Sequence, residues 1–360
     1  MLKTIKNAFK TPEIRKKILY TLLLLVVFRL GCYITIPGVD IVTLESSMDA
    51  YSNTVTGMIN MISGGAFSRL SIFAMSITPY ITASIVIQLL GIIIPSLRRL
   101  TTEGGEEGRK KIDRYTKLIT LALALIEGLG IYLSYRTSGI FVDESILTGV
   151  VAVVSLMAGT SLLMWLGDKI TSKGIGNGIS MLIFAGIVSS LPSAVVAVAS
   201  RIVVDGQFST TGLLTALGIV LGVLVLIVGV VFVQQAERRI PVQYSKKVVG
   251  RRMVGAQNTH IPIKPAMASV MPIIFASSFM TFPAMIIQLF VSDIETQTGF
   301  WRVIYNLSIA TSSSSVGWQY TIINAIIYLL LIVGFTYFYT YATFNPAEVA
   351  NNIKQNGGFI

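Results

Sequence analysis

The chain has 360 residues, of which 53% are hydrophobic and only 12% are charged, and its mean hydropathy is +0.74. A soluble fold could not bury so much apolar side chain, so composition excludes a water-soluble protein and predicts a membrane protein. The formal net charge is nevertheless +11. The single cysteine, Cys32, excludes an internal disulfide framework, and the single histidine, His260, leaves no metal-ligand cluster and no evident catalytic triad. We therefore expect neither an enzyme nor a cofactor.

Residues 1–17 form a basic, amphipathic stretch. Leu2, Ile5 and Phe9 recur at helical spacing with lysines between them, which is typical of a helix at a membrane surface. Pro12 favours the first turn of a helix that continues into the first apolar run. That run is too long for the apolar core of a cleavable signal peptide, so we expect it to cross the membrane.

Apolar runs long enough to cross a bilayer as helices, at roughly 20 residues each, occur about eight times. The expected spans are 18–37, 73–94, 118–135, 147–166, 179–199, 213–233, 266–290 and 320–341. Lys and Arg are enriched on the cytoplasmic side of membrane proteins. With a cytoplasmic N-terminus, 23 of the 28 Lys and Arg residues fall in segments on that side. This asymmetry predicts an all-α, multi-pass membrane protein whose N-terminus is cytoplasmic.

The segment 39–70, between the first two spans, is too polar to cross the membrane and too apolar for an ordinary exposed loop. Its core, 57–68, is expected to form about three helical turns, weakened by Gly64 and Gly65. Short hydrophobic segments broken by glycine are typical of re-entrant elements, which need surrounding protein or a water-filled cavity. A helix on the external surface is an open alternative.

Proline interrupts two of the expected spans, at Pro79 and Pro283. A proline inside a helix removes a backbone hydrogen bond and tends to kink it. In both spans the sequence Ile-Phe-Ala precedes the proline and Gln-Leu follows it. Since the expected topology runs these spans in opposite directions, the similarity favours an inverted repeat, a plan common in transport proteins.

Two polar connections carry much of the charge. The connection 95–117 faintly resembles a phosphate-binding loop, but its spacing is wrong and Glu106 and Glu107 would repel a triphosphate, so we expect a solvated connector. The loop 234–265 carries seven basic residues against the single acid Glu237. That excess favours a docking surface for an acidic protein or RNA phosphates over a loop that only fixes topology.

Arg29 and Glu127 are charged residues inside expected spans, and each either marks an ion path or is paired internally. A coupled transporter usually carries several intramembrane carboxylates or histidines. A secondary transporter with inverted repeats is therefore the alternative function, and a non-conducting assembly or insertion factor is a third. The lining of any pore is expected to be mostly uncharged.

Several sequence runs carry a family resemblance and lie in order over most of the chain. They are 60–68 with 72–74 and 79–84, then 163–168, 174–180, 257–262 and 272–278. Together they resemble the SecY family, the central subunits of bacterial protein-conducting channels. The resemblance implies a ten-helix inverted-repeat channel in the bacterial plasma membrane, without enzyme activity. Such a channel passes unfolded secretory polypeptides across the membrane or releases apolar segments sideways into lipid.

The resemblance also implies four groups of site residues. The pore ring would consist of Ile77, Ile81, Ile183, Ile274 and Ile286. The plug of the closed pore would be 57–68, with Asn60, Met61, Ile62, Ser63, Gly64, Gly65, Ala66 and Phe67. The lateral gate would lie between the second and seventh spans, with Gln88, Asn177, Pro79 and Pro283. Arg251 and Arg252 would engage the ribosome or the SecA motor ATPase.

The implied partners are SecE and SecG homologues, SecA, the ribosome, polypeptides with signal sequences and the lipid bilayer. The expected division is a surface segment 1–17, an N-terminal channel half 18–199 and a partial C-terminal half 213–360 that holds the docking loop. Because the family has ten spans, we expect the last two spans and a sixth ring residue to be missing here. We also expect that residues 1–360 alone do not close a complete pore.

Overall fold

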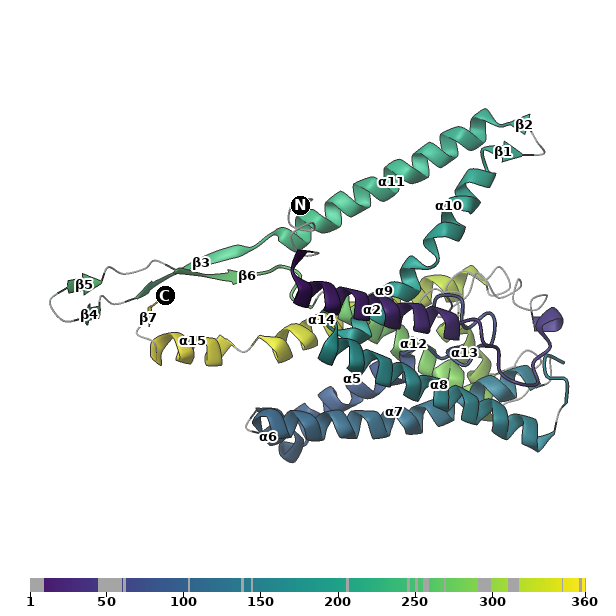
Figure 1. The fold of residues 1–360 in the computed structure, drawn as a ribbon, viewed down its shortest axis with the longest axis horizontal. Coiled ribbons are helices and arrows are strands. Elements are labelled where there is room, and N and C mark those ends of the chain that lie inside the picture. Colours follow the sequence, from purple (N-terminus) through teal and green to yellow (C-terminus); the bar gives the residue numbers. More distant parts are fainter. Residues whose placement is uncertain are drawn as a thin grey trace. The chain divides into compact units, whose positions relative to one another are not determined.

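The computed structural model is mostly helical (Figure 1). It describes residues 10–44, 60, 63–102, 104–136, 139–143, 145–204, 207–244, 247–249, 252–254, 259–268, 270–290, 299–309, 317–344, 346–355 and 358–359. The chain divides into two units, and each is described by itself. The first combines Met1–Ser193 with Ser277–Tyr328, and the second combines Ala194–Ala276 with Leu329–Ile360.

Helix α2 spans Pro12–Gly31 and confirms that the helix of the first span begins in the basic stretch. Proline lies in its first turn and Glu13 lies at the positive end of the helix dipole. Thr11 precedes the helix but makes no side-chain cap hydrogen bond. The amphipathic residues 1–9 lie outside the described residues.

The expected loop at 95–117 is wrong, because most of it is helical, although most of its described side chains are exposed, as in a solvated connector. After α5 (Thr78–Ile93), helix α6 covers Pro95–Thr102 and α7 covers Gly105–Arg136. Pro95 suits the first turn of α6, and the acidic first turn of α7 complements the helix dipole. The glycines and glutamates that resembled a phosphate loop therefore begin a long helix.

Helix α8, Ile146–Lys173, packs along α7. The Lys117 ammonium on α7 lies 2.6 Å from the Asp168 carboxylate on α8 and 2.7 Å from Asp113 on its own helix. The expected fifth span, 179–199, is divided into α9 (Gly178–Val188) and α10 (Leu191–Ser200). Pro192 lacks the N–H that would continue the hydrogen bonds of α9.

In the second unit, short strands β1 (Val203–Val204) and β2 (Gln207–Phe208) pair and precede α11, Thr210–Gln235. The expected loop 234–265 is largely an antiparallel hairpin of β3 (Arg238–Tyr244) and β6 (Thr259–Ile263), in which Ile240 faces Ile261. Branched and aromatic residues alternate along β3, which suits a strand.

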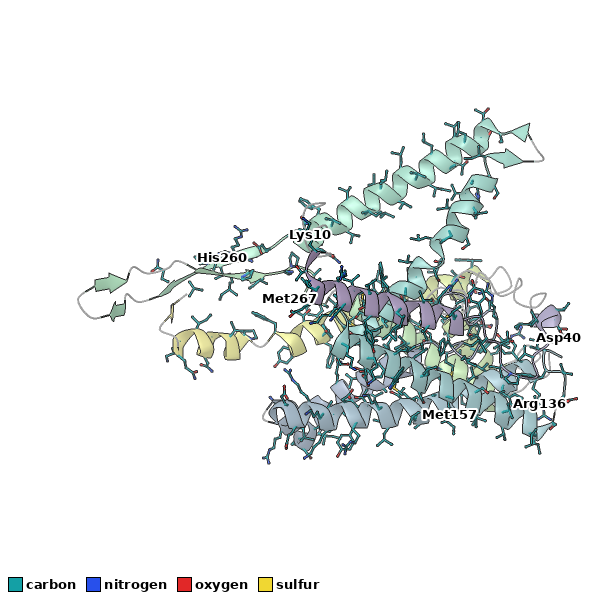
Figure 2. The ribbon with its side chains drawn as sticks, in the orientation of Figure 1. Lys10, Asp40, Arg136, Met157, His260 and Met267 are labelled. Carbon is teal, nitrogen blue, oxygen red and sulfur yellow. The ribbon has the colours of Figure 1, made fainter. Side chains whose placement is uncertain are left out.

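Smaller strands extend this hairpin. β4 (Lys247–Val249) pairs with β5 (Arg252–Val254) at its far end, and β7 (Gly358–Phe359) pairs with β3 (Figure 1). The single histidine, His260, lies on β6 opposite Pro241 (Figure 2). The interleaved apolar residues of this basic segment are thus explained by strand pairing.

The remaining helices are α12 (Met271–Phe290), α13 (Phe300–Ile309), α14 (Trp318–Thr343) and α15 (Pro346–Gln355). Pro283 lies inside α12, as the sequence predicts. The matching expectation for Pro79 is wrong, because that residue lies in the first turn of α5, where proline starts a helix. The two prolines therefore do not interrupt equivalent helices.

Among the described residues, five helices are long and apolar enough to cross a membrane. They are Gly105–Leu133, Ile146–Lys173, Gly178–Ser200, Thr210–Gln235 and Trp318–Tyr341. Two shorter apolar helices, Thr78–Gly91 and Met271–Ala284, correspond to the expected second and seventh spans. The mostly helical, multi-pass class is confirmed.

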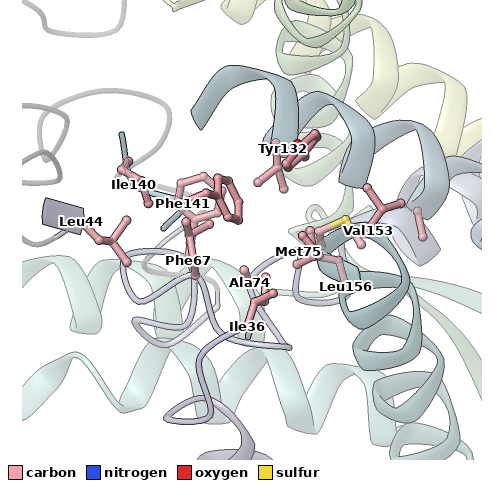
Figure 3. Close-up of a cluster of buried hydrophobic side chains, with 14 residues drawn as sticks. Ile36, Leu44, Phe67, Ala74, Met75, Tyr132, Ile140, Phe141, Val153 and Leu156 are labelled. Carbon is pink, nitrogen blue, oxygen red and sulfur yellow. The ribbon is translucent and has the colours of Figure 1, made fainter. Parts of the chain in front are cut away.

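Two buried clusters form the core of the first unit. One, which we call the α7–α8 cluster, gathers side chains from these helices and from the segments 36–44, 67–75 and 140–141 (Figure 3). Phe141 meets Tyr132 edge to face, with ring centroids 5.2 Å apart. The other, the α2–α9 cluster, joins α2, α8, α9 and the start of α5.

Candidate functional site

The segment expected to be re-entrant folds into hydrogen-bonded turns. The Asn60 side-chain oxygen accepts the Ser68 N–H at 3.0 Å, and the Asn60 carbonyl accepts the Gly65 N–H at 2.8 Å. The Ser63 hydroxyl accepts the Phe67 N–H at 3.2 Å. The expected helix is therefore wrong for residues 63–68, because side-chain and turn hydrogen bonds replace the helical ladder. Residues 57–59, Met61 and Ile62 lie outside the described residues.

These turns are buried between the two clusters. Ala66 is fully buried in the α2–α9 cluster, whereas the adjacent Phe67 packs into the α7–α8 cluster near Tyr135. Ser63 is also fully buried. A helix on the external surface is thus excluded for residues 63–68, and protein surrounds this short segment as a re-entrant element requires.

Three of the five expected ring isoleucines meet in one place. Ile77, at the start of α5, is 2% exposed and belongs to the α2–α9 cluster, and Ile81 and Ile183 pack against it. Ile286 is half-buried on α12 and is absent from the described residues that form this cluster, and Ile274, also half-buried, belongs to the second unit. The cluster therefore joins Ala66 of the buried turns to isoleucines from α5 and α9.

The expected gate residues have separate local roles. Asn177 caps α9, accepting the N–H groups of Ile179 at 3.0 Å and Ser180 at 3.3 Å. Gln88 is exposed on α5 and donates to the Ser84 hydroxyl at 3.2 Å. Pro79 and Pro283 lie on α5 and α12, as described above.

Of the expected docking residues, Arg252 begins β5, and Arg251 lies outside the described residues. The register pairs Arg252 with Val249 at the end of the β4–β5 ladder. The basic segment is therefore carried on paired strands that extend from α11.

Arg29, one of the two intramembrane charges noted in the sequence, is paired internally. It lies in the last turn of α2 and donates to the Gly64 carbonyl and, at 3.1 Å, to the Ser189 hydroxyl. Glu127 is buried on α7 at 6% exposed and takes no part in the ion pairs of the described residues. Sequence reasoning missed Ser189; its only signal was the Ser-Ser-Leu-Pro sequence that follows α9.

Comparison with known proteins identifies relatives along the whole chain. The sequence profile of the SecY family matches residues 71–360. The protein translocase subunit SecY of Streptomyces coelicolor is 42% identical, over 100% of this chain and 81% of its own length. Those of Halalkalibacterium halodurans and Staphylococcus aureus are 41% and 38% identical, over 100% of this chain and 81% and 80% of their lengths.

Solved structures show the same fold at low sequence identity. One, described as the structure of a protein conducting channel, has a TM-score of 0.63 at 19% identity, covering 98% of this chain and 81% of that chain. Another, Sec61 in the canine ribosome-channel complex from the endoplasmic reticulum, has a TM-score of 0.60 at 20% identity, covering 97% and 80%.

Proposed function

The chain belongs to the SecY family and is a protein-conducting channel subunit of the Sec translocase, and from this premise we propose how it closes its pore. It is a multi-pass membrane protein that transports polypeptide and catalyses no reaction. In the proposal, the isoleucines Ile77, Ile81, Ile183, Ile274 and Ile286 line the waist of the pore, and residues 57–68 plug it. The observation that carries the proposal is the packing of Ala66 in one cluster with Ile77, Ile81 and Ile183.

The chemistry of isoleucine suits such a waist. Branched apolar side chains can close around a moving chain without binding it, whereas charged side chains would hold it or attract ions. A narrow apolar constriction also loses its water, which resists ion leakage. Ala66, which belongs to this cluster, and the equally buried Ser63 fit a segment that fills the waist when no substrate is present.

We place the lateral gate at α5 and α12, with Gln88, Asn177, Pro79 and Pro283 beside the path into lipid. Pro283 supports a flexible gate, because a proline inside a helix frees a carbonyl and weakens the helix locally. The amide of Gln88, which bonds Ser84 on the same helix, is exposed on α5 and accessible to a segment that passes the gate. Through this gate, apolar segments of a substrate would pass into the bilayer, while secretory polypeptides pass unfolded through the pore.

We assign the basic hairpin, with Arg251 and Arg252, to docking of the ribosome or SecA on the cytoplasmic side. The positive excess of 234–265 supports an acidic or RNA partner, and the related Sec61 lies in a ribosome-channel complex. The asymmetry of Lys and Arg supports a cytoplasmic N-terminus in the bacterial plasma membrane. SecE and SecG homologues would complete the complex.

Crosslinking to a stalled secretory chain tests the pore. Cysteines would replace Ile77, Ile183 and Ile274 in the complete channel complex, and a secretory chain held halfway across would carry a photoreactive or disulfide-forming group. We expect crosslinks at all three positions, because the translocating chain must touch the waist.

Ile131→Cys provides the matched control, since Ile131 is a similarly buried isoleucine but belongs to the α7–α8 cluster. It should remain uncrosslinked. Absence of crosslinks at the three ring positions in an otherwise active complex, or equal crosslinking at Ile131, would refute the pore assignment.

A further inference from the structure

Three segments of the first unit meet at the guanidinium of Arg29. This side chain extends from the last turn of α2 to the Gly64 carbonyl in the buried turns and to the Ser189 hydroxyl, 3.1 Å away, at the end of α9. Ser189 in turn donates to the Gly186 carbonyl at 2.6 Å. One cation thus joins two helix ends to the segment that the proposed function assigns to the plug.

The charge is balanced by carbonyl and hydroxyl oxygens. In the ion pairs of the described residues, Arg29 has no carboxylate partner. It lies instead at the negative ends of two helix dipoles, since both α2 and α9 end there. The bond to the Gly64 carbonyl stabilises the buried turns while they are in place. When this segment moves away, Arg29 loses its carbonyl partner.

Gly64 is shaped for this approach. Its φ of +67° is a conformation that favours glycine, and an added Cβ would lie 2.8 Å from the Ser189 hydroxyl and 3.1 Å from the Arg29 guanidinium. Only a residue without a side chain lets the backbone carbonyl meet the guanidinium here.

Neighbouring groups hold the guanidinium in position. Arg29 also donates to the Tyr33 hydroxyl at 3.3 Å, and the Tyr33 ring lies beneath two guanidinium groups, 5.1 Å from that of Arg29 and 4.4 Å from that of Arg69. Cys32, fully buried beside them, directs its thiol toward the Ser63 carbonyl at 3.7 Å. The planar fork is therefore oriented before it binds the plug segment, which lowers the entropy lost on binding.

We propose that Arg29 is a positioning residue that latches the plug in the closed channel, through the Gly64 carbonyl on one side and Ser189 on the other. The inference rests on the proposed role of 57–68 as the plug. Opening must break the bond to Gly64, so Arg29 sets how readily the resting channel opens. A signal sequence or docking partner would have to outweigh this bond, which makes Arg29 a determinant of how strictly the channel discriminates among substrates.

Chloride efflux from vesicles that contain the complete channel complex tests the latch. Arg29→Gln removes the charge and the fork, and the resting leak should rise about tenfold, since a hydrogen bond to a charged group typically shifts an equilibrium by that factor or more. Arg29→Lys keeps the charge without the fork and should leak less than Arg29→Gln. Ser189→Ala, which removes only a hydroxyl, should raise the leak about twofold to threefold.

Arg136→Gln is the matched control, because Arg136 is likewise the basic residue in the last turn of its helix, α7, but is exposed and makes no contact with Gly64. Its leak should equal that of the unmodified channel. The amount of assembled complex is measured for each variant, and Ser189→Ala and Arg29→Lys decide the test if Arg29→Gln does not assemble.

Deleting residues 57–68 separates this inference from the proposed function. If the deletion does not raise the leak, the plug assignment fails. If the deletion raises the leak and Arg29→Gln does not, the plug stands and the latch is refuted. In the deleted background Arg29→Gln should add nothing, because residues that act through one contact are not additive; an added leak there would also refute the latch.

Discussion

Two long apolar helices, α8 and α11, look alike in the sequence and differ in the fold. Both are rich in Val, Leu and Gly, and each is long enough to cross a bilayer. Yet 39% of the apolar stretch of α8 is buried, against 6% of that of α11. Side chains of α8 enter both buried clusters of the first unit, whereas among those described on α11 only Ala216 is buried.

Their glycines show what this difference means. On α8, a Cβ at Gly159 would collide with the Ile72 carbonyl, and one at Gly149 would lie 2.6 Å from the Tyr132 ring. On α11, a Cβ at Gly218, Gly222 or Gly229 would meet nothing within 4 Å, although one at Gly212 in the first turn would collide with the Arg201 carbonyl. Small residues on α8 thus permit the close packing that drives association of helices in membranes, whereas most glycines of α11 have no such close neighbour within the second unit.

The largest difference between α8 and α11 is expected when a bulkier side chain replaces a glycine on each helix. Gly159→Val should prevent the channel from reaching its folded state, because the new side chain would overlap the backbone at Ile72 and overpacking without room to relax is severely destabilising. The measurement is the yield and protease resistance of the complex after membrane insertion. Gly222→Val on α11 should leave both unchanged; equal damage from the two variants would contradict the assignment of α8 as the packed helix.

Removing volume should produce a smaller contrast. Leu156 on α8 is 1% exposed, and Leu226 on α11 is 68% exposed. Leu156→Ala should lower the free energy of unfolding by about 2–5 kcal/mol through lost contacts and a cavity, visible as a lower melting temperature of the complex in detergent. Leu226→Ala should change it by less than about 0.5 kcal/mol, as expected for a surface substitution. A large effect at Leu226 would show that another subunit covers α11.

Removing the helix caps should have the smallest effect on stability, and the effect should be the same for α8 and α11. The Ser145 hydroxyl accepts the Leu147 N–H at the start of α8, and the Ser209 hydroxyl accepts the Gly212 N–H at the start of α11, each at 3.1 Å. Since capping is local, Ser145→Ala and Ser209→Ala should each cost about 1 kcal/mol. Hydrogen exchange of the first turn of each helix measures the loss. A cost confined to one helix would show that burial, and not the cap, controls the ends.

The sequence predicted more about where helices lie than about what they touch. Apolar runs located α11 and α14 to within a few residues, because a length of apolar side chains is enough to define a span, whereas α8 continues beyond its expected end at residue 166 to Lys173. It misread Pro79, since the rule that proline kinks a helix gives the wrong result when the helix begins beside it. It also missed the helices in 95–117, where charge and glycine suggested a loop in place of α6 and the first turns of α7.

Only part of the proposed site could be predicted from the sequence. The similarity of motifs selected Ile77, Ile81 and Ile183, although no periodicity distinguishes these isoleucines from those that face lipid. Their meeting with Ala66 depends on turns held by Asn60 and Ser63, whose side chains accept backbone N–H groups several residues away. Such competition between side chain and backbone depends on local geometry, and the glycines of this segment indicated only that a helix there would be weak.

By itself, the sequence determined that the protein is a multi-pass membrane protein with few charged residues and a strongly basic segment at 234–265, and its motifs indicated the channel family. These properties follow from composition, the length of the apolar runs and the distribution of Lys and Arg, all of which are present in the linear sequence before it folds. Only the tertiary structure decided that Arg29 binds the Gly64 carbonyl and Ser189, and that α8 contributes to both buried clusters of the first unit. Those outcomes depend on contacts between residues up to 160 positions apart in the sequence. The shapes and hydrogen-bonding groups of the folded segments decide which of these residues meet.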